Sequence, residues 1–249
     1  MSRGYLVLFC CAVAAAQDAR QIVAESLKRT RSQSQRYEGV LQVIDARGGT
    51  TEKRWRYDRI GAAGESKTIL RFTAPAEVKD VAVLVVNHPD RPSEQWMWTP
   101  AIQRERRIAV QDRSTRFFGT GFSFEDLEER DVEHYDYQLV GEETFEGALC
   151  WKIRSQPKKS RSSQYTHTFT WMRKENYTLV QVEAYAGEKI ARKLNWREWE
   201  RIQGIWTARR LEVFDARRNT RTIMKLEKLD YNETMKDEDF TLQALRRGS

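Results

Sequence analysis

The side chains that could do acid–base or metal chemistry in this sequence are few and lie far apart. Its three histidines, His88, His134 and His167, do not stand at HExxH or comparable metal-ligand spacing, and no paired cysteines supply a zinc site. Cys150 lies in an apolar, strand-like run, so we expect a buried thiol rather than a nucleophile. The pattern predicts no metal, no cofactor and no enzyme. Distant residues could still converge, so an enzyme with an unfamiliar active site stays open as an alternative.

Carboxylates are the other candidates for acid–base roles. The segment SFEDLEER, from Ser123 to Arg130, places four acids after a serine. A serine followed by acids in the first turn is typical of a helix N-terminus, where solvated carboxylates stabilise the helix dipole. We therefore expect a helix over 123–130 rather than a catalytic acid and base.

The N-terminus has the layout of a cleavable secretory signal. A basic residue, Arg3, precedes an apolar run and a short stretch of alanines that ends at Ala16. We expect a signal peptide over 1–16, cleaved near Ala16, and export to the periplasm. The remaining chain, 17–249, contains no linker rich in Pro, Gly or Ser, which indicates a single domain.

The spacing of apolar residues predicts one helix followed by many strands. Over 18–34 an apolar face is formed by Ala19, Ile22, Val23 and Leu27, as in an amphipathic helix. From Tyr37 onward the period becomes two, with turn sequences between the runs. Examples of same-side pairs are Trp55 and Tyr57, Leu70 and Phe72, Trp96 and Trp98, and Leu211 and Val213. A long antiparallel meander with one apolar face is expected, and that face needs a cover.

Residues 96–126 have a distinctive order of residue types: strand-forming aromatic pairs, a basic run and a Gly/Phe loop. The markers are Trp96, Trp98, Pro100, Arg104, Arg106, Arg107, Ile108, Gly119, Phe122, Ser123, Phe124 and Asp126. Later markers include Gly141, Gly147, Cys150, Trp171, Trp206 and Phe240. With these residues the chain resembles the LolA-like outer-membrane lipoprotein-sorting protein family over most of its length after about residue 35.

The resemblance implies a mainly β (α+β) fold, in which a curved antiparallel sheet forms an incomplete β-barrel with helices as a lid over an apolar cavity. It also implies a periplasmic carrier that binds lipid or lipoprotein acyl chains and moves them towards the outer membrane. An inner-membrane transporter of the RND/MMPL type is the partner that the resemblance suggests. The alternative is a periplasmic lipid-sensing domain that signals to a membrane partner without transport. A second alternative is an exported lipid-modifying enzyme.

Apolar residues on alternating strand positions are the candidates for the lipid-binding wall. They are Leu70, Phe72, Leu84, Val86, Trp96 and Trp98. The last four fall in adjacent expected strands, whose apolar sides would face together. For any single aromatic residue an ordinary core position is the competing interpretation, because only part of an apolar sheet face can line a cavity.

Release of cargo requires a cavity that can open. Gly119, Gly121 and Phe122 lie in the expected lid, where the glycines would permit hinge motion. The alternative is that both glycines only satisfy a tight turn.

The chain is basic, with 43 Lys and Arg against 36 Asp and Glu and a net charge of +7. An exported basic surface attracts anionic lipid headgroups or acidic partners, whereas export argues against nucleic acid. Arg104, Arg106 and Arg107 are the candidates for contact with a headgroup, a membrane surface or a partner. Alternatively, they form an exposed sheet edge that discourages strand pairing.

Overall fold

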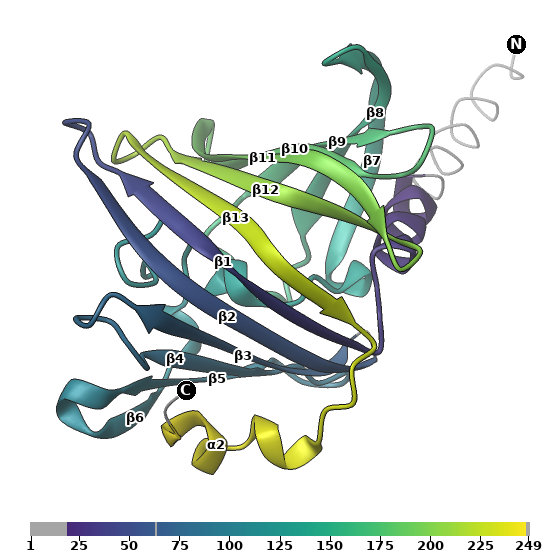
Figure 1. The fold of residues 1–249 in the computed structure, drawn as a ribbon. Helices are drawn as coiled ribbons and strands as arrows, with labels where there is room; N and C mark the ends of the chain where they lie inside the picture. Colours follow the sequence, from purple (N-terminus) through teal and green to yellow (C-terminus); the bar gives the residue numbers. More distant parts are fainter. Residues whose placement is uncertain (1–18, 63, 248–249) are drawn as a thin grey trace, which may run out of the picture.

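The computed structural model describes residues 19–62 and 64–247, so the expected signal peptide lies outside the described residues. The described chain forms one open antiparallel sheet of thirteen strands (Figure 1), in the order β6-β5-β4-β3-β2-β1-β13-β12-β11-β10-β9-β8-β7. The strands are β1 Ser34–Ile44, β2 Thr50–Ala62, β3 Glu65–Ala74, β4 Ala82–Val86, β5 Glu94–Thr99, β6 Arg104–Arg107, β7 Tyr135–Phe145, β8 Ala148–Pro157, β9 His167–Arg173, β10 Leu179–Ala186, β11 Lys189–Ile202, β12 Ile205–Asp215 and β13 Thr220–Tyr231. The predicted antiparallel meander is confirmed.

Helical segments are short. Residues 19–29 are helical, and α2 covers Leu242–Arg246. The 3-10 turns are η1 Pro100–Ile102, η2 Val110–Asp112, η3 Glu125–Leu127, η4 Val132–His134 and η5 Asp237–Phe240. No helix in the described part of the chain has the length and apolar character needed to cross a membrane.

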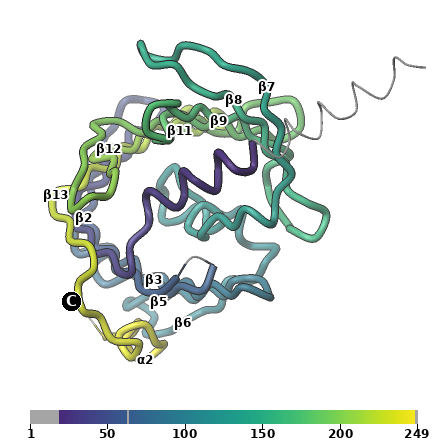
Figure 2. Tube along the Cα trace, turned by 90° about the vertical axis from the view of Figure 1, so that its right-hand side faces the viewer, coloured from purple at the N-terminus to yellow at the C-terminus, as the bar shows by residue number. Residues whose placement is uncertain are grey.

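The sheet curves strongly, and Figure 2 shows the helix of residues 19–29 lying within its concave side. Ala19, Ile22 and Val23 are buried there against Ile153 and Met172, in β8 and β9. The amphipathic face predicted from the sequence is therefore the face that packs. The helix ends at residue 29, earlier than expected, because β1 begins at Ser34.

The largest buried cluster lies on the concave side of the other half of the sheet. Trp55, Phe72 and Val83 pack there against Phe117 and Phe122, which follow β6 in the sequence. The Phe72 and Phe117 rings stack with centroids 5.2 Å apart. This packing holds the loop after β6 against the sheet.

A third cluster lies elsewhere in the fold, where the C-terminal segment packs on β3, β4 and β5. Phe240 and Leu245 are buried against Leu84, with Trp96 and Trp98 alongside. Figure 1 shows α2 and the turn before it beneath this end of the sheet. These strands are therefore apolar on both faces.

Residues 123–129 cross the concave side and are called here the acidic strap. The expected helix over 123–130 is wrong, since only η3 is helical and Glu128 is already extended, with φ −75° and ψ 145°. Its acids are not solvated but bind partners on distant segments. These contacts fix the strap in addition to the short-range hydrogen bonds of η3.

The strap is joined to both halves of the sheet by buried ion pairs. Glu129 Oε1 accepts a hydrogen bond from Arg59 Nη2 of β2 at 2.8 Å, and Asp126 pairs with Arg192 of β11. The Arg192 and Asp126 side chains are 6% and 13% exposed. Since β1, β13 and β12 lie between β2 and β11 in the sheet, the strap spans three intervening strands.

Two further acids fix the strap to loops. Glu128 pairs with Arg113 at 2.5 Å and with Arg161 at 2.9 Å. Glu125 accepts hydrogen bonds from Ser163 Oγ at 2.5 Å and from the backbone N–H of Gln164 at 2.9 Å. All four carboxylates therefore have named partners outside the strap.

Cys150 is fully buried, as predicted, and burial raises the pKa of its thiol above the ordinary value. A raised pKa disfavours the thiolate, which is the reactive form of cysteine. Cys150 therefore packs as a small apolar residue.

Asp126→Ala should lower the free energy of unfolding by about 3–5 kcal/mol, because it leaves the buried Arg192 without its carboxylate. Urea denaturation measures this change. The control is Glu105→Ala, which removes an exposed ion pair with Arg246 and should change stability by about 0–1 kcal/mol. Equal losses in the two variants would show that the strap pair is not a structural anchor.

Gly39→Ala should lower the free energy of unfolding by about 1–3 kcal/mol. A Cβ at Gly39 would lie 1.9 Å from the carbonyl oxygen of Lys225, where β1 bulges against β13. Gly141→Ala is the matched control, since a Cβ there meets no atom within 4 Å. The expectation fails if both variants denature at the same urea concentration.

Candidate functional site

A cavity of about 410 Å³ lies between the concave face, the helix of residues 19–29 and the acidic strap. Its wall is mainly apolar and comes from strands at the two ends of the sequence. The apolar lining residues are Leu27, Tyr37, Leu41, Trp55, Tyr57, Leu70, Phe72, Val83, Val85, Phe117, Phe122, Leu127, Trp196, Leu211, Met224 and Leu226. A volume of this size, with a mainly apolar wall and some polar groups, is typical of a small-molecule binding site.

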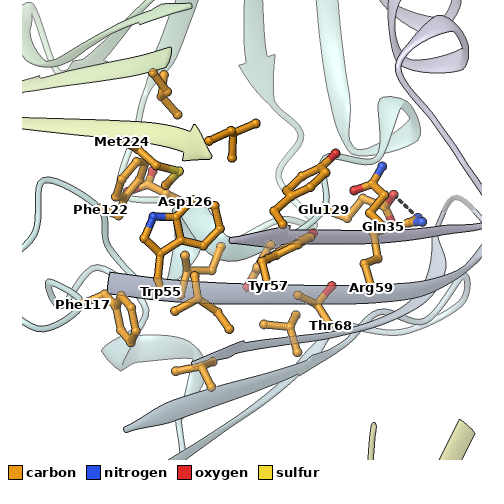
Figure 3. Close-up of a pocket in the computed structure, with 18 of the residues that line it drawn as sticks. Gln35, Trp55, Tyr57, Arg59, Thr68, Phe117, Phe122, Asp126, Glu129 and Met224 are labelled. Atoms are coloured by element: carbon orange, nitrogen blue, oxygen red, sulfur yellow. Dashed lines mark hydrogen bonds and ion pairs between the residues drawn. The ribbon is translucent and has the colours of Figure 1, made fainter. Parts of the chain in front are cut away.

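Polar groups gather at one end of the cavity. Figure 3 shows Gln35, Arg59 and Glu129 on one side and Phe117 and Met224 on the other. Glu129 also accepts a hydrogen bond from Ser66 Oγ at 2.7 Å, so the Arg59–Glu129 pair is well compensated. This end can contact the polar part of a ligand, while the opposite end is mainly apolar, with Asp126 beside Phe122 and Met224.

The strap forms the polar cover of the cavity. Asp126 accepts hydrogen bonds from Arg192 and from Tyr165 Oη, the latter at 2.8 Å. Burial, followed by the charge of Asp126, raises the pKa of Tyr165 well above its usual range. Burial is the largest single influence on Arg192 and lowers its pKa, but Asp126, Tyr165 and Asp215 together outweigh burial, so the pKa of Arg192 is raised. Both side chains therefore stay protonated, and the cover carries a compensated charge.

The structure places two of the six expected wall residues, Leu70 and Phe72, in the cavity lining. The others, Leu84, Val86, Trp96 and Trp98, lie outside this lining and pack in the cluster with Phe240 and Leu245. Val83 and Val85 line the cavity in their place. All of Ala82–Val86 is apolar, so alternation could not determine which side chains face inward.

Several residues that line the cavity were not predicted from the sequence. Trp55 and Tyr57 lie on β2, and Met224 and Leu226 lie on β13. Trp55 and Tyr57 alternate with arginines in the sequence. This alternation was sufficient to predict that both side chains lie on the same face of their strand. The pairing of β1 with both β2 and β13 brings these residues together, and local sequence does not reveal that pairing.

The residues expected in the lid lie in a closed loop. Phe122 lines the cavity and Gly119 has φ 74°, a conformation that favours glycine. Gly121 does not have a positive φ but is closely packed. Its N–H donates a hydrogen bond to Thr222 Oγ1 at 2.7 Å, and a Cβ added there would lie 3.1 Å from the Val213 side chain.

Arg104, Arg106 and Arg107 lie on β6, the edge strand of the sheet, and are exposed. The Arg107 guanidinium lies 5.8 Å from the Trp96 ring centroid. None of these arginines lines the cavity. A charged edge strand discourages pairing with another sheet, and the same charges face solvent where a headgroup or partner could reach them.

The histidines lie apart from the cavity lining and from one another in the fold. His88 precedes β5, His134 ends η4, and His167 stacks on Tyr185 with ring centroids 4.6 Å apart. Within residues 19–62 and 64–247, no three His, Cys, Asp or Glu side chains gather as metal ligands would.

Solved structures of similar fold cover nearly the whole chain. A domain assigned to outer membrane lipoprotein sorting, from Vibrio parahaemolyticus, is 22% identical with a TM-score of 0.87, covering 93% of this chain and 100% of its own. A DUF1329 family protein from Desulfovibrio piger is 24% identical with a TM-score of 0.89, covering 93% and 99%. A LolA superfamily protein from Nitrosomonas europaea is 16% identical with a TM-score of 0.70, covering 94% and 98%.

A search of curated proteins found no match. A protein family described as "Uncharacterized protein" matches residues 64–247, which is most of the chain. The chain therefore belongs to this family, and its fold is the LolA-like fold of outer membrane lipoprotein-sorting domains.

Proposed function

We propose that this protein is a non-catalytic periplasmic carrier that binds acyl chains of lipids or lipoproteins in the cavity under the acidic strap. The observation that carries the proposal is the cavity of about 410 Å³ with a continuous aromatic and aliphatic wall. An acyl chain gains about 0.8 kcal/mol for each methylene removed from water, so such a wall favours a long apolar ligand. The LolA-like fold supports the same class of cargo.

A carrier must also release its cargo, and the loop from Arg116 to Phe122 is the proposed gate. Phe122 fills part of the wall, so displacing it would open the cavity. Gly119 supplies the hinge at positive φ, and Gly121 detaches when its bond to Thr222 breaks. The strap, held by buried ion pairs, stays in place while the loop moves.

The direction of transport and the partner belong to the same proposal. Export by the expected signal peptide would place the carrier in the periplasm, between an inner-membrane transporter of the RND/MMPL type and the outer membrane. Arg104, Arg106 and Arg107 are the proposed contacts with a membrane surface or partner, since all three are exposed at the sheet edge.

The experiment is native mass spectrometry of protein purified from the periplasm, followed by extraction and identification of released lipid. A stoichiometric lipid or acylated peptide supports the proposal, and a transfer assay between donor and acceptor vesicles then separates a carrier from a sensor that binds without transfer. Protein that is reproducibly empty and takes up no fluorescent fatty acid would contradict it.

Met224→Trp should weaken binding of a fluorescent fatty acid about tenfold, because the larger ring occupies cavity volume that would otherwise hold two or more methylenes. Fluorescence titration measures the dissociation constant. Leu149→Trp makes a comparable change at a position that is 51% exposed and outside the cavity, and it should bind like wild type. Unchanged binding in Met224→Trp with a folded protein would remove the cavity assignment.

A further inference from the structure

A second cavity of about 250 Å³ adjoins the first. Six residues line both cavities: Leu27, Thr30, Tyr37, Trp196, Ala208 and Leu226. The two cavities are therefore neighbouring compartments of one concave interior, and a single elongated ligand can occupy both.

The wall of the second cavity contains buried polar atoms without hydrogen-bond partners among the described residues. They are Ser155 Oγ, Thr170 Oγ1, Trp199 Nε1, and Arg130 Nε and Nη2. Ser155 is 1% exposed and Thr170 3%. Ser155 of β8 pairs with Thr168 of β9, and Thr170 lies two residues further on, so both hydroxyls belong to the same face of the sheet. Buried polar groups normally have partners, and a polar ligand in this cavity would supply the missing ones.

The charge of this wall indicates the sign of the charge that a ligand would carry. Arg130 is its charged residue, and no Asp or Glu contributes to it. The Arg130 guanidinium lies 4.4 Å from the Tyr135 ring centroid but forms no ion pair with a carboxylate of the described chain. The first cavity differs, because Asp126, Glu128 and Glu129 all contribute to its lining. The unpaired donors of the second cavity are therefore suited to an anion.

We propose that the second cavity is a subsite for the anionic headgroup of the cargo, a phosphate or carboxylate, while the acyl chain lies in the first cavity. The inference rests on the carrier function proposed above and narrows its cargo to anionic amphiphiles. Arg130 pairs with the charge, and Ser155, Thr170 and Trp199 donate hydrogen bonds to its oxygens.

The test is a competition between two lipids that differ only in charge. The full-length exported protein is incubated with phosphatidylcholine vesicles that hold equal mole fractions of dimyristoylphosphatidylglycerol and dimyristoylglycerol, and native mass spectrometry measures the ratio of the two bound lipids. Wild type should favour the anionic lipid about tenfold. Arg130→Gln should abolish that preference and still bind diacylglycerol. Arg54→Gln is the control, since Arg54 lines neither cavity and pairs with Glu227 at the surface.

A stability measurement separates a binding role from a structural one. Thr170→Val replaces a hydroxyl without a partner by a methyl group, so the empty protein should melt at the same or a higher temperature while its preference for the anionic lipid falls. A lower melting temperature with an unchanged preference would assign Thr170 to the fold and overturn its part in the subsite.

The remaining outcomes are distinguishable. Equal uptake of both lipids by wild type and Arg130→Gln overturns the headgroup subsite and leaves the carrier function standing, whereas no uptake of either lipid overturns both.

Inorganic phosphate added to the competition identifies the source of the anion. If phosphate suppresses only the phosphatidylglycerol uptake, the subsite binds free anions as well; if it has no effect and the preference persists, the subsite requires the attached chain.

Discussion

The buried ion pairs of the acidic strap are the constraint on which the interior of this protein depends. An open, curved sheet exposes an apolar concave face, and neither the helix of residues 19–29 nor the loop after β6 covers it alone. Asp126 and Glu129 attach the strap to Arg192 of β11 and Arg59 of β2. Burying these carboxylates is favourable only because each has a cation and further donors at hydrogen-bond distance. The strap thereby keeps the concave face covered without filling it.

The strap is held by these ion pairs and by Phe124, which packs against Phe117, while the space beneath it remains open. Trp55, Phe72 and Phe122 surround that space from three segments of the chain, and Leu27 of the N-terminal helix lines both this cavity and the second one. The interior thus combines an apolar compartment with a compartment that is rich in unpaired donors. This division matches the two ends of an amphiphile, an acyl chain and a charged headgroup.

Local sequence was informative where one face of an element is buried and the other is not. The helix with Ala19, Ile22 and Val23 on one face, the strands of β2, and the buried Cys150 could be predicted on this basis. The inward face of β4 could not, since both of its faces are covered. The acids of the strap were also misread, because their partners Arg59 and Arg192 lie 70 and 66 residues away. Long-range charge pairs leave no local pattern.

The pairing of β1 with β13 joins the first strand of the sheet to the last. Ile44 lies opposite Arg221 and Gln35 opposite Tyr231, so this seam unites segments nearly two hundred residues apart, whereas every other pair in the sheet joins consecutive strands. Local hairpins can form as the chain emerges, but the seam must wait for the final strand and carries the largest loop-closure entropy. Both cavities include residues from each side of this seam. Both cavities therefore depend on this long-range pairing, which local hairpins alone do not provide.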